Sequence, residues 1–318
     1  MGAVDIQNRL IANMHALHMV DCPVCGLRLG RGKYMDLAMH FTTLAEESDS
    51  KHISWMNRNL TRVRSDAEKL SSMLEKYYSL NGKGIKEWII KDFVDHFRGS
   101  SPHPFILAMQ TYNENVLKGY VIEHHHFLKQ WIKSCSYVMA KTDLEEIQDY
   151  ELENIMTELH GYGKDKPSHH ELLIRMGESL GIPEEEILKS VPLPATERSV
   201  SIWNRIASER TWIETMAAMH SLELVANRDL GRYGARYPYF DPEIFSNGKT
   251  TPAVRDFLRE GYEADVSHSY VALDLVEKYC NPENVENIQG SYLLSAGAFS
   301  EYLEARLERG EMIENKQQ

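Results

Sequence analysis

The first residues that could do chemistry are two cysteines and two histidines near the N-terminus. Cys22-Pro23-Val24-Cys25 places two thiolates on one tight turn. Fourteen residues separate Cys25 from His40, and eleven separate His40 from His52. Zinc prefers four sulfur and nitrogen ligands in a tetrahedron, and this segment supplies two of each. The spacing therefore predicts one structural zinc ion held by Cys22, Cys25, His40 and His52.

This segment resembles a Cys2His2 zinc finger in its cysteine pair, in Leu29 and in the Leu37-x-x-His40 spacing. The gap between its histidines exceeds the roughly three to five residues of that family, which leaves His18 as an alternative fourth ligand. A redox-active cysteine pair or a loop without metal are the other interpretations, although no thioredoxin-like βαβ pattern surrounds the pair. We expect a small docking element rather than a DNA-reading finger, because one finger on an acidic chain lacks the positive charge that phosphates require.

A second set of ionisable side chains lies on helical stripes that should be apolar. Glu223 lies between Leu222 and Leu224, and Asp265 and His268 are one helical turn apart. The candidate ligands are Glu158, His169, Glu223, Asp265 and His268, with Glu123 and His126 as further candidates. Carboxylates mixed with imidazoles favour non-haem iron or manganese over zinc or copper. Taken singly, each residue also has a structural interpretation, as a core histidine or a paired glutamate.

The elements that must position these residues are helices. Apolar residues recur every three or four positions through most of the chain, and long alternating β-branched runs are absent. The predicted helices are 66–80, 84–97, 115–140, 143–160, 169–180, 200–228, 253–280 and 287–308. This pattern predicts an all-α fold, a bundle of long helices. The breakers at 98–104 divide the chain into a zinc-finger-like and helical segment, 1–98, and a helical bundle, 99–318.

One irregular segment, 229–252, interrupts the helical pattern and is rich in glycine, proline and aromatic residues. Irregular connections of this length inside a bundle are often functional. Arg232, Arg236 and Tyr237 are therefore candidates for binding an anionic or aromatic substrate. The alternative is a surface loop packed by its own tyrosines.

Composition excludes several classes of protein. The chain has 318 residues, a net charge of −12 and four cysteines. The acidic balance argues against nucleic acid as the main partner, and four cysteines do not make a disulfide scaffold. No apolar run suggests a membrane span, and the N-terminus does not resemble a secretory signal, so we expect a cytoplasmic protein.

Residues from about 102 to 308 resemble the haem-oxygenase-like bundle shared by thiaminase II, pyrroloquinoline-quinone synthase and the haem-oxygenase-like di-iron oxidases. The resemblance is carried by four stretches: His103-Pro104-Phe105, the helix–loop–helix from 154 to 182, the run 218–224 around Glu223, and Asp265-Val266-Ser267-His268. The last stretch matches the end of a His-x-x-x-Asp-x-x-His ligand motif. Gly261 stands where that motif has its first histidine.

The resemblance implies two irons that activate O2. Glu158 and His169 would hold one iron, Asp265 and His268 the other, with Glu223 shared. Either one iron would be held weakly because of Gly261, or Glu260, Glu123, His126 or the substrate would supply the missing ligand. The implied function is an oxidase or oxygenase acting on a small carboxylate-bearing or aromatic metabolite. Its partners would be O2, that metabolite and an external electron donor, and by analogy the chain would form a homodimer.

Two other functions remain open. One is a metal-free hydrolase of the thiaminase II type, or a cofactorless oxidase, for which Cys135 is the available thiol nucleophile. The other is a non-catalytic interaction protein clipped by zinc, whose polar core residues form a hydrogen-bond network. This second alternative predicts basic partners for Glu223 and Asp265.

Overall fold

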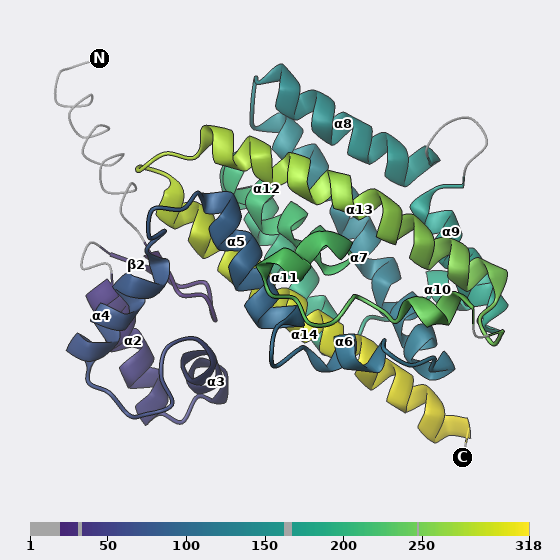
Figure 1. Ribbon diagram of the computed structural model, residues 1–318, viewed down its shortest axis with the longest axis horizontal. Coiled ribbons are helices and arrows are strands. Elements are labelled where there is room, and N and C mark those ends of the chain that lie inside the picture. The colour runs from purple at the N-terminus through teal and green to yellow at the C-terminus, as the bar shows by residue number, and fades with distance from the viewer. Residues whose placement is uncertain (1–19, 31–33, 162–166, 247, 318) are drawn as a thin grey trace.

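The computed structural model describes residues 20–30, 34–161, 167–246 and 248–317, except for the side chains of 262–268 and 317. Within these ranges the regular elements are helices, apart from one short antiparallel hairpin (Figure 1), and this confirms the predicted all-α class. The N-terminal elements are β1 (Val20–Asp21), β2 (Arg28–Leu29), α2 (Tyr34–Glu46), α3 (Ser50–Asn59) and α4 (Ala67–Tyr78).

The remaining elements form the helical bundle. They are α5 (Ile85–Phe93), the π-helix η1 (Val94–Arg98), α6 (Pro104–Ala108), α7 (Glu114–Ala140), α8 (Glu145–His160), α9 (His169–Ser179), α10 (Glu184–Leu188), α11 (Pro194–Glu209), α12 (Trp212–His220), the 3-10 helices η2 (Ser221–Val225), η3 (Arg228–Tyr233) and η4 (Pro242–Phe245), α13 (Pro252–Tyr279) and α14 (Val285–Gln317). Figure 1 shows α2, α3 and α4 at one end of the molecule, beside the bundle. No described helix is long and apolar enough to cross a membrane.

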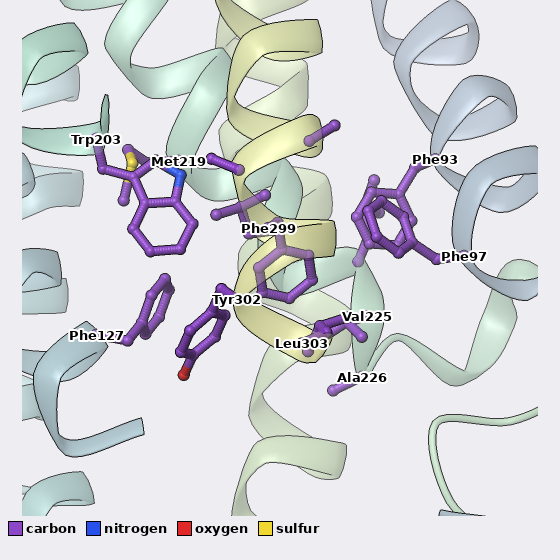
Figure 2. Packing of buried hydrophobic residues seen from close by; sticks show 14 of the residues in the cluster. Phe93, Phe97, Phe127, Trp203, Met219, Val225, Ala226, Phe299, Tyr302 and Leu303 are labelled. Carbon is purple, nitrogen blue, oxygen red and sulfur yellow. The ribbon is translucent and has the colours of Figure 1, made fainter. Parts of the chain in front are cut away.

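Helix α14 packs along α7, α11 and α12 and forms the centre of the bundle. Aromatic side chains fill the space between these helices (Figure 2): the ring of Phe127 lies 5.2 Å from that of Trp203 and 5.4 Å from that of Tyr302. The indole N–H of Trp203 donates to Ser295 Oγ at 3.0 Å, so this large ring is buried without an unpaired polar group.

Two glycines bring α7 and α14 together. A Cβ on Gly119 would lie 2.1 Å from the backbone oxygen of Arg306, and a Cβ on Gly310 would lie 2.8 Å from that of Asn115. Only glycine permits so close an approach of two helix backbones. This contact sets the position of Arg306 relative to α7.

The predicted helix 200–228 is three elements rather than one. Arg210 adopts an extended conformation and ends α11. Thr211 then caps α12 through a capping box, in which its side chain bonds the backbone of Glu214 and the Glu214 carboxylate bonds the backbone of Thr211. The last turn, η2, is a 3-10 helix, so Glu223 lies on a tightened turn and not within an α-helix.

The N-terminal hairpin rests on the bundle. Oδ2 of buried Asp21 lies 2.7 Å from Nη1 of buried Arg210. Gly26, in the left-handed region at φ +70°, packs against Arg205 and Leu294 so closely that a Cβ would lie 2.8 Å and 3.1 Å from them. Helix α5 precedes the predicted boundary at 98, yet it packs against α13 and α14 of the bundle.

Candidate functional site

The predicted zinc ligands come together at the N-terminal hairpin. The turn between β1 and β2 holds Cys22 and Cys25, and helices α2 and α3 supply His40 and His52. One ligand atom from each of the four lies within 4.8 Å of all the others. Cys22 Sγ is 3.4 Å from His52 Nε2, and Cys25 Sγ is 3.4 Å from His40 Nε2. Two sulfurs and two imidazole nitrogens gathered in this way fit a tetrahedral zinc ion. The alternative ligand, His18, lies outside the described residues.

Asp49 orients the imidazole of His52. Its Oδ1 lies 2.7 Å from Nδ1 of His52 and accepts a hydrogen bond from the backbone N–H of the same residue, which also caps α3. With the Nδ1 proton donated to this carboxylate, Nε2 of His52 is left to face Cys22. A hydrogen bond with Cys22, and further ones with His52 and His40, lower the pKa of the Cys25 thiol to about 3. A thiolate is the form that zinc binds.

A cavity of about 80 Å³ lies within the bundle, among α7, α8, α9, η2, α13 and α14. Much of its wall is apolar, with Phe127, Trp131, Leu222 and Phe257 among the lining side chains. Its polar lining residues are Tyr120, His124, Glu158, His169, Glu223, Tyr239 and Arg306. Three of the predicted iron ligands, from three separate elements, are thus brought to one cavity.

Glu158 and His169 are in direct contact. Glu158 lies near the end of α8, and His169 is the first residue of α9, after the capping Ser168. Nδ1 of His169 is 3.1 Å from Oε1 of Glu158, and its Nε2 is 3.9 Å from Oε2 of Glu260. Glu260, the residue before Gly261, therefore lies beside His169.

Glu223 belongs to a buried chain of charged groups. His220 Nε2 lies 2.8 Å from Oε1 of Glu151, and its Nδ1 lies 3.5 Å from Oε2 of Glu223. Burial alone would lower the pKa of His220, but the carboxylates of Glu151 and Glu223 outweigh it and raise the pKa to about 10. The imidazolium orients Glu223, whose Oε2 is buried and makes no hydrogen bond.

The side chains of Asp265 and His268 lie outside the described residues. Their helix, α13, lines the cavity through Phe257, Leu258 and Gly261. The position of the missing histidine is therefore at the cavity wall.

Glu123 and His126 have partners away from the cavity. Oε1 of Glu123 accepts from Nε of Arg309 at 2.7 Å, and its Oε2 accepts from the backbone N–H of Leu193 at 3.2 Å. His126 Nε2 lies 3.1 Å from Ser190 Oγ. Both carboxylate oxygens of Glu123 are thus used by the fold, and neither Glu123 nor His126 is part of the described cavity lining. The histidine of this run that lines the cavity is His124.

Segment 229–252 reaches the cavity through Tyr239 and not through the residues that the sequence singled out. Arg232 is exposed, and its guanidinium stacks on the rings of Tyr233 and Tyr270. Arg236 is exposed as well, and its backbone N–H donates to Arg98 O, while Tyr237 O accepts from Arg98 Nε. Among the residues that the structure describes, Arg232, Arg236 and Tyr237 are not part of the cavity lining.

Sequence reasoning missed a cluster around Arg306 on α14. Its Nη1 donates to the Tyr239 hydroxyl at 2.9 Å, and its Nη2 lies 2.6 Å from the Tyr302 hydroxyl and 2.9 Å from Nδ1 of His124. The guanidinium carbon lies 3.9 Å from the ring centre of Tyr120. A signal was present, because Arg306 continues the inward stripe of Phe299, Tyr302 and Leu303 at helical spacing. The buried ion pair between Glu151 and His220 was not predicted from the sequence either.

The cavity wall carries oxygen and nitrogen donors, although no three of its described residues bring ligand atoms within 4.8 Å of one another. Glu223 contributes a carboxylate whose Oε2 makes no hydrogen bond and forms an ion pair with His220 at 3.5 Å. The described lining adds the carboxylate of Glu158 and the imidazole of His169. This donor set is that of non-haem iron or manganese.

Comparison with known families separates two parts of the chain. Residues 19–79 match a C2H2-type zinc finger in one copy. This match supports the predicted zinc site, even though the gap between its two histidines is longer than the spacing given above for this kind of finger. Residues 90–309 match the TENA/THI-4/PQQC family, whose members are generally enzymes. A search of curated protein sequences finds no match.

Solved structures with the same fold share little sequence with this chain. A TenA homologue from P. horikoshii OT3 is 12% identical, with a TM-score of 0.54, over 74% of this chain and 98% of its own. A domain of unknown function with a heme oxygenase-like fold from Shewanella denitrificans OS217 is 18% identical, with a TM-score of 0.52, over 79% and 96%. A TenA homologue from Pseudomonas syringae pv. tomato is 11% identical, with a TM-score of 0.53, over 75% and 92%. At these identities they show the heme oxygenase-like fold alone. Because the family match spans more than half of its residues, this chain belongs to the TENA/THI-4/PQQC family and carries a C2H2 zinc finger at its N-terminus.

Proposed function

We propose that this protein is an O2-activating non-haem di-iron oxidase or oxygenase that acts on a small metabolite. The observation that carries the proposal is the set of carboxylate and imidazole donors, Glu158, His169 and Glu223, that three separate elements bring to the wall of one cavity. These residues would hold iron together with Asp265 and His268 of α13, and Glu260 would replace the histidine absent at Gly261. When bound, iron supplies the redox and Lewis-acid chemistry that reduces O2, which side chains alone lack.

The protein's own residues prepare the site. Nδ1 of His169 lies 3.1 Å from Oε1 of Glu158, a contact that orients both side chains at the cavity wall. His220, held by Glu151, forms an ion pair with the carboxylate of Glu223 and so orients it. The apolar lining, including Phe127 and Trp131, excludes water and so strengthens electrostatic interactions inside the cavity.

The test is metal content after anaerobic loading of the full chain with ferrous iron. We expect about two iron and one zinc per chain, and oxygen uptake when air is admitted. Glu223→Gln should lower iron and leave zinc unchanged. Glu123→Gln is the matched control, because Glu123 is a buried carboxylate of the same bundle that is bonded to Arg309 and does not line the cavity, and it should retain the iron of the wild type. Zinc without iron in the wild-type protein would contradict the proposal.

A metal-free hydrolase of the thiaminase II type is the second candidate, since family membership alone allows it. Its proposed nucleophile, Cys135, is buried beside Glu151 and His220, and burial raises the pKa of its thiol well above the ordinary value. Cys135 does not lie in the described lining of the cavity. This reaction would survive removal of iron by a chelator, whereas oxidase activity would not.

The non-catalytic alternative predicted a basic partner for Glu223, and His220 is such a partner. It requires an iron-free cavity, so the same loading experiment decides it. As partners of the oxidase we propose O2, a small organic substrate, an external electron donor and, by analogy with the fold, a second copy of the chain.

A further inference from the structure

Arg306 is a buried cation at the wall of the cavity. Only 2% of its surface is exposed, and the guanidinium is enclosed by the rings of Phe105, Tyr120 and Tyr302, at 5.1, 3.9 and 4.4 Å. Its Nη atoms bond Tyr239, Tyr302 and His124, while its Nε–H is buried and makes no hydrogen bond with a described residue. Of its five N–H donors, therefore, not all are used by the fold.

The groups that surround Arg306 carry no negative charge. Burial raises the pKa of the Tyr120 and Tyr302 hydroxyls, which stay protonated. Burial, and then the charge of Arg306 itself, lower the pKa of His124, which stays neutral. None of the described carboxylates forms an ion pair with Arg306, whereas Arg309, one turn later on the same helix, pairs with Glu123. The charge of Arg306 has no counter-ion within the described part of the chain.

The fold does not need this charge to satisfy its neighbours. The Tyr239 hydroxyl donates to the Tyr120 hydroxyl at 3.0 Å, and the Tyr302 hydroxyl lies 2.7 Å from Nδ1 of His124. These pairs would remain bonded if the guanidinium were removed. A buried cation without a counter-ion is unfavourable, and stacking on aromatic rings offsets only part of that cost. A ligand that brings the negative charge is the simplest way to complete the site.

We propose that the cavity binds a small organic acid and that Arg306 pairs with its carboxylate. This inference rests on the proposed function, because that acid would be the substrate of the oxidase. One buried cation matches the single charge of a carboxylate better than the double charge of a phosphate. The apolar lining, with Phe127, Leu222 and Phe257, suits an aromatic or aliphatic body.

His124 links the two ends of the cavity. It contacts Arg306 through Nδ1, and its ring centre lies 6.0 Å from that of His169. An acid anchored at Arg306 would therefore extend its body toward Glu158 and His169. This arrangement separates substrate binding from metal binding, so that the two can be tested independently.

The experiment measures binding of two isosteric pairs, benzoate with benzamide and hexanoate with hexanamide, to the full chain loaded with zinc but not iron. We expect at least one acid to bind about tenfold or more tightly than its amide, since charge-assisted hydrogen bonds are stronger than neutral ones. Arg306→Gln should remove this preference and Arg306→Lys should restore part of it. Arg198→Gln, which removes an exposed arginine charge from α11, should not affect the preference.

Equal binding of acid and amide by the wild type, or no binding of either acid, would overturn the inference whether or not the variants fold. Acid binding that appears only with iron, and is unchanged in Arg306→Gln, would also overturn it and would leave the oxidase proposal standing. Acid binding that depends on Arg306 in a protein that takes up no iron would support the inference and reject the oxidase.

Discussion

The contact between α7 and α14 offers the sharpest test of the structure, through Gly119→Ala. The new Cβ would lie 2.1 Å from the backbone oxygen of Arg306 and 2.7 Å from the backbone nitrogen of Gly310. Real Cβ contacts begin at about 3.0 Å, so the two backbones must separate by about 0.9 Å. Overpacking of this kind costs about 1–3 kcal/mol or more, and alanine regains about 1 kcal/mol over glycine in a helix. Because the contact is with rigid backbone, we expect a net loss near the upper end of the difference, up to about 2 kcal/mol, or roughly 4–8 °C in Tm.

The assay is urea and thermal unfolding followed by circular dichroism. Gly310→Ala should cost less, since its Cβ would lie 2.8 Å from the nearest backbone atom. Gly231→Ala is the control, because a Cβ there would meet nothing within 4 Å. If Gly119→Ala unfolded at the same urea concentration as Gly231→Ala, the close approach of the two helices would be refuted. The displacement also moves Arg306, so Gly119→Ala should weaken any acid binding that depends on it.

Three further predictions concern the zinc site and the loss of stability at acid pH. Cys22→Ser should lose zinc and have a lower Tm, whereas Cys280→Ser, which lies outside the ligand cluster, should keep its zinc. Equal zinc content and equal Tm in the two variants would contradict the zinc site. Asp49→Asn should still cap α3 but bind zinc about 10–100-fold more weakly, as measured by competition with a chelator, because the hydrogen bond to the imidazole is weakened. Asp92 is buried; burial opposes ionisation, but the charge of His96 and hydrogen bonds from His96, Tyr77 and Tyr292 prevail and lower its pKa. Its contribution to stability is therefore complete above the unfolded pKa of about 3.9 and is lost as the pH falls through the lower folded value. Asp92→Asn should be less stable at pH 7 and lose less stability between pH 5 and 2; an unchanged pH profile would reject this assignment.

Helical periodicity predicted the all-α class and most of the helices, because each long helix buries a regular stripe. The error at 200–228 has a local cause. The apolar spacing continues across Arg210, so periodicity alone does not show the break, whereas Thr211-Trp212-Ile213-Glu214 is a capping-box signature at that point. Caps decide where a helix begins, and they must be considered together with the stripe.

The zinc ligands could be predicted because cysteines and histidines at close spacing have few structural alternatives. The cavity was harder to predict. Glu223 and Glu123 looked alike in sequence, as carboxylates on apolar stripes. Only the fold shows that Glu123 is bonded to Arg309 away from the cavity, whereas Glu223 pairs with His220 and lines the cavity. Arg309 comes from another helix, 186 residues away in sequence, and helical periodicity carries no information about such a pairing.

Arg306 shows most clearly what a one-dimensional pattern omits. An arginine on a terminal helix is usually predicted to be a surface residue. Its place on an apolar stripe could equally be explained by a long side chain that reaches solvent. It is buried because Gly119 lets α14 approach α7 so closely that the aromatic residues of both helices enclose the guanidinium. The glycine has no chemistry and the arginine has no unusual neighbours in sequence, yet together they place a positive charge in an apolar cavity. A search for binding residues therefore gains from asking which glycines bring backbones together, since the side chains opposite them are those that cannot reach solvent.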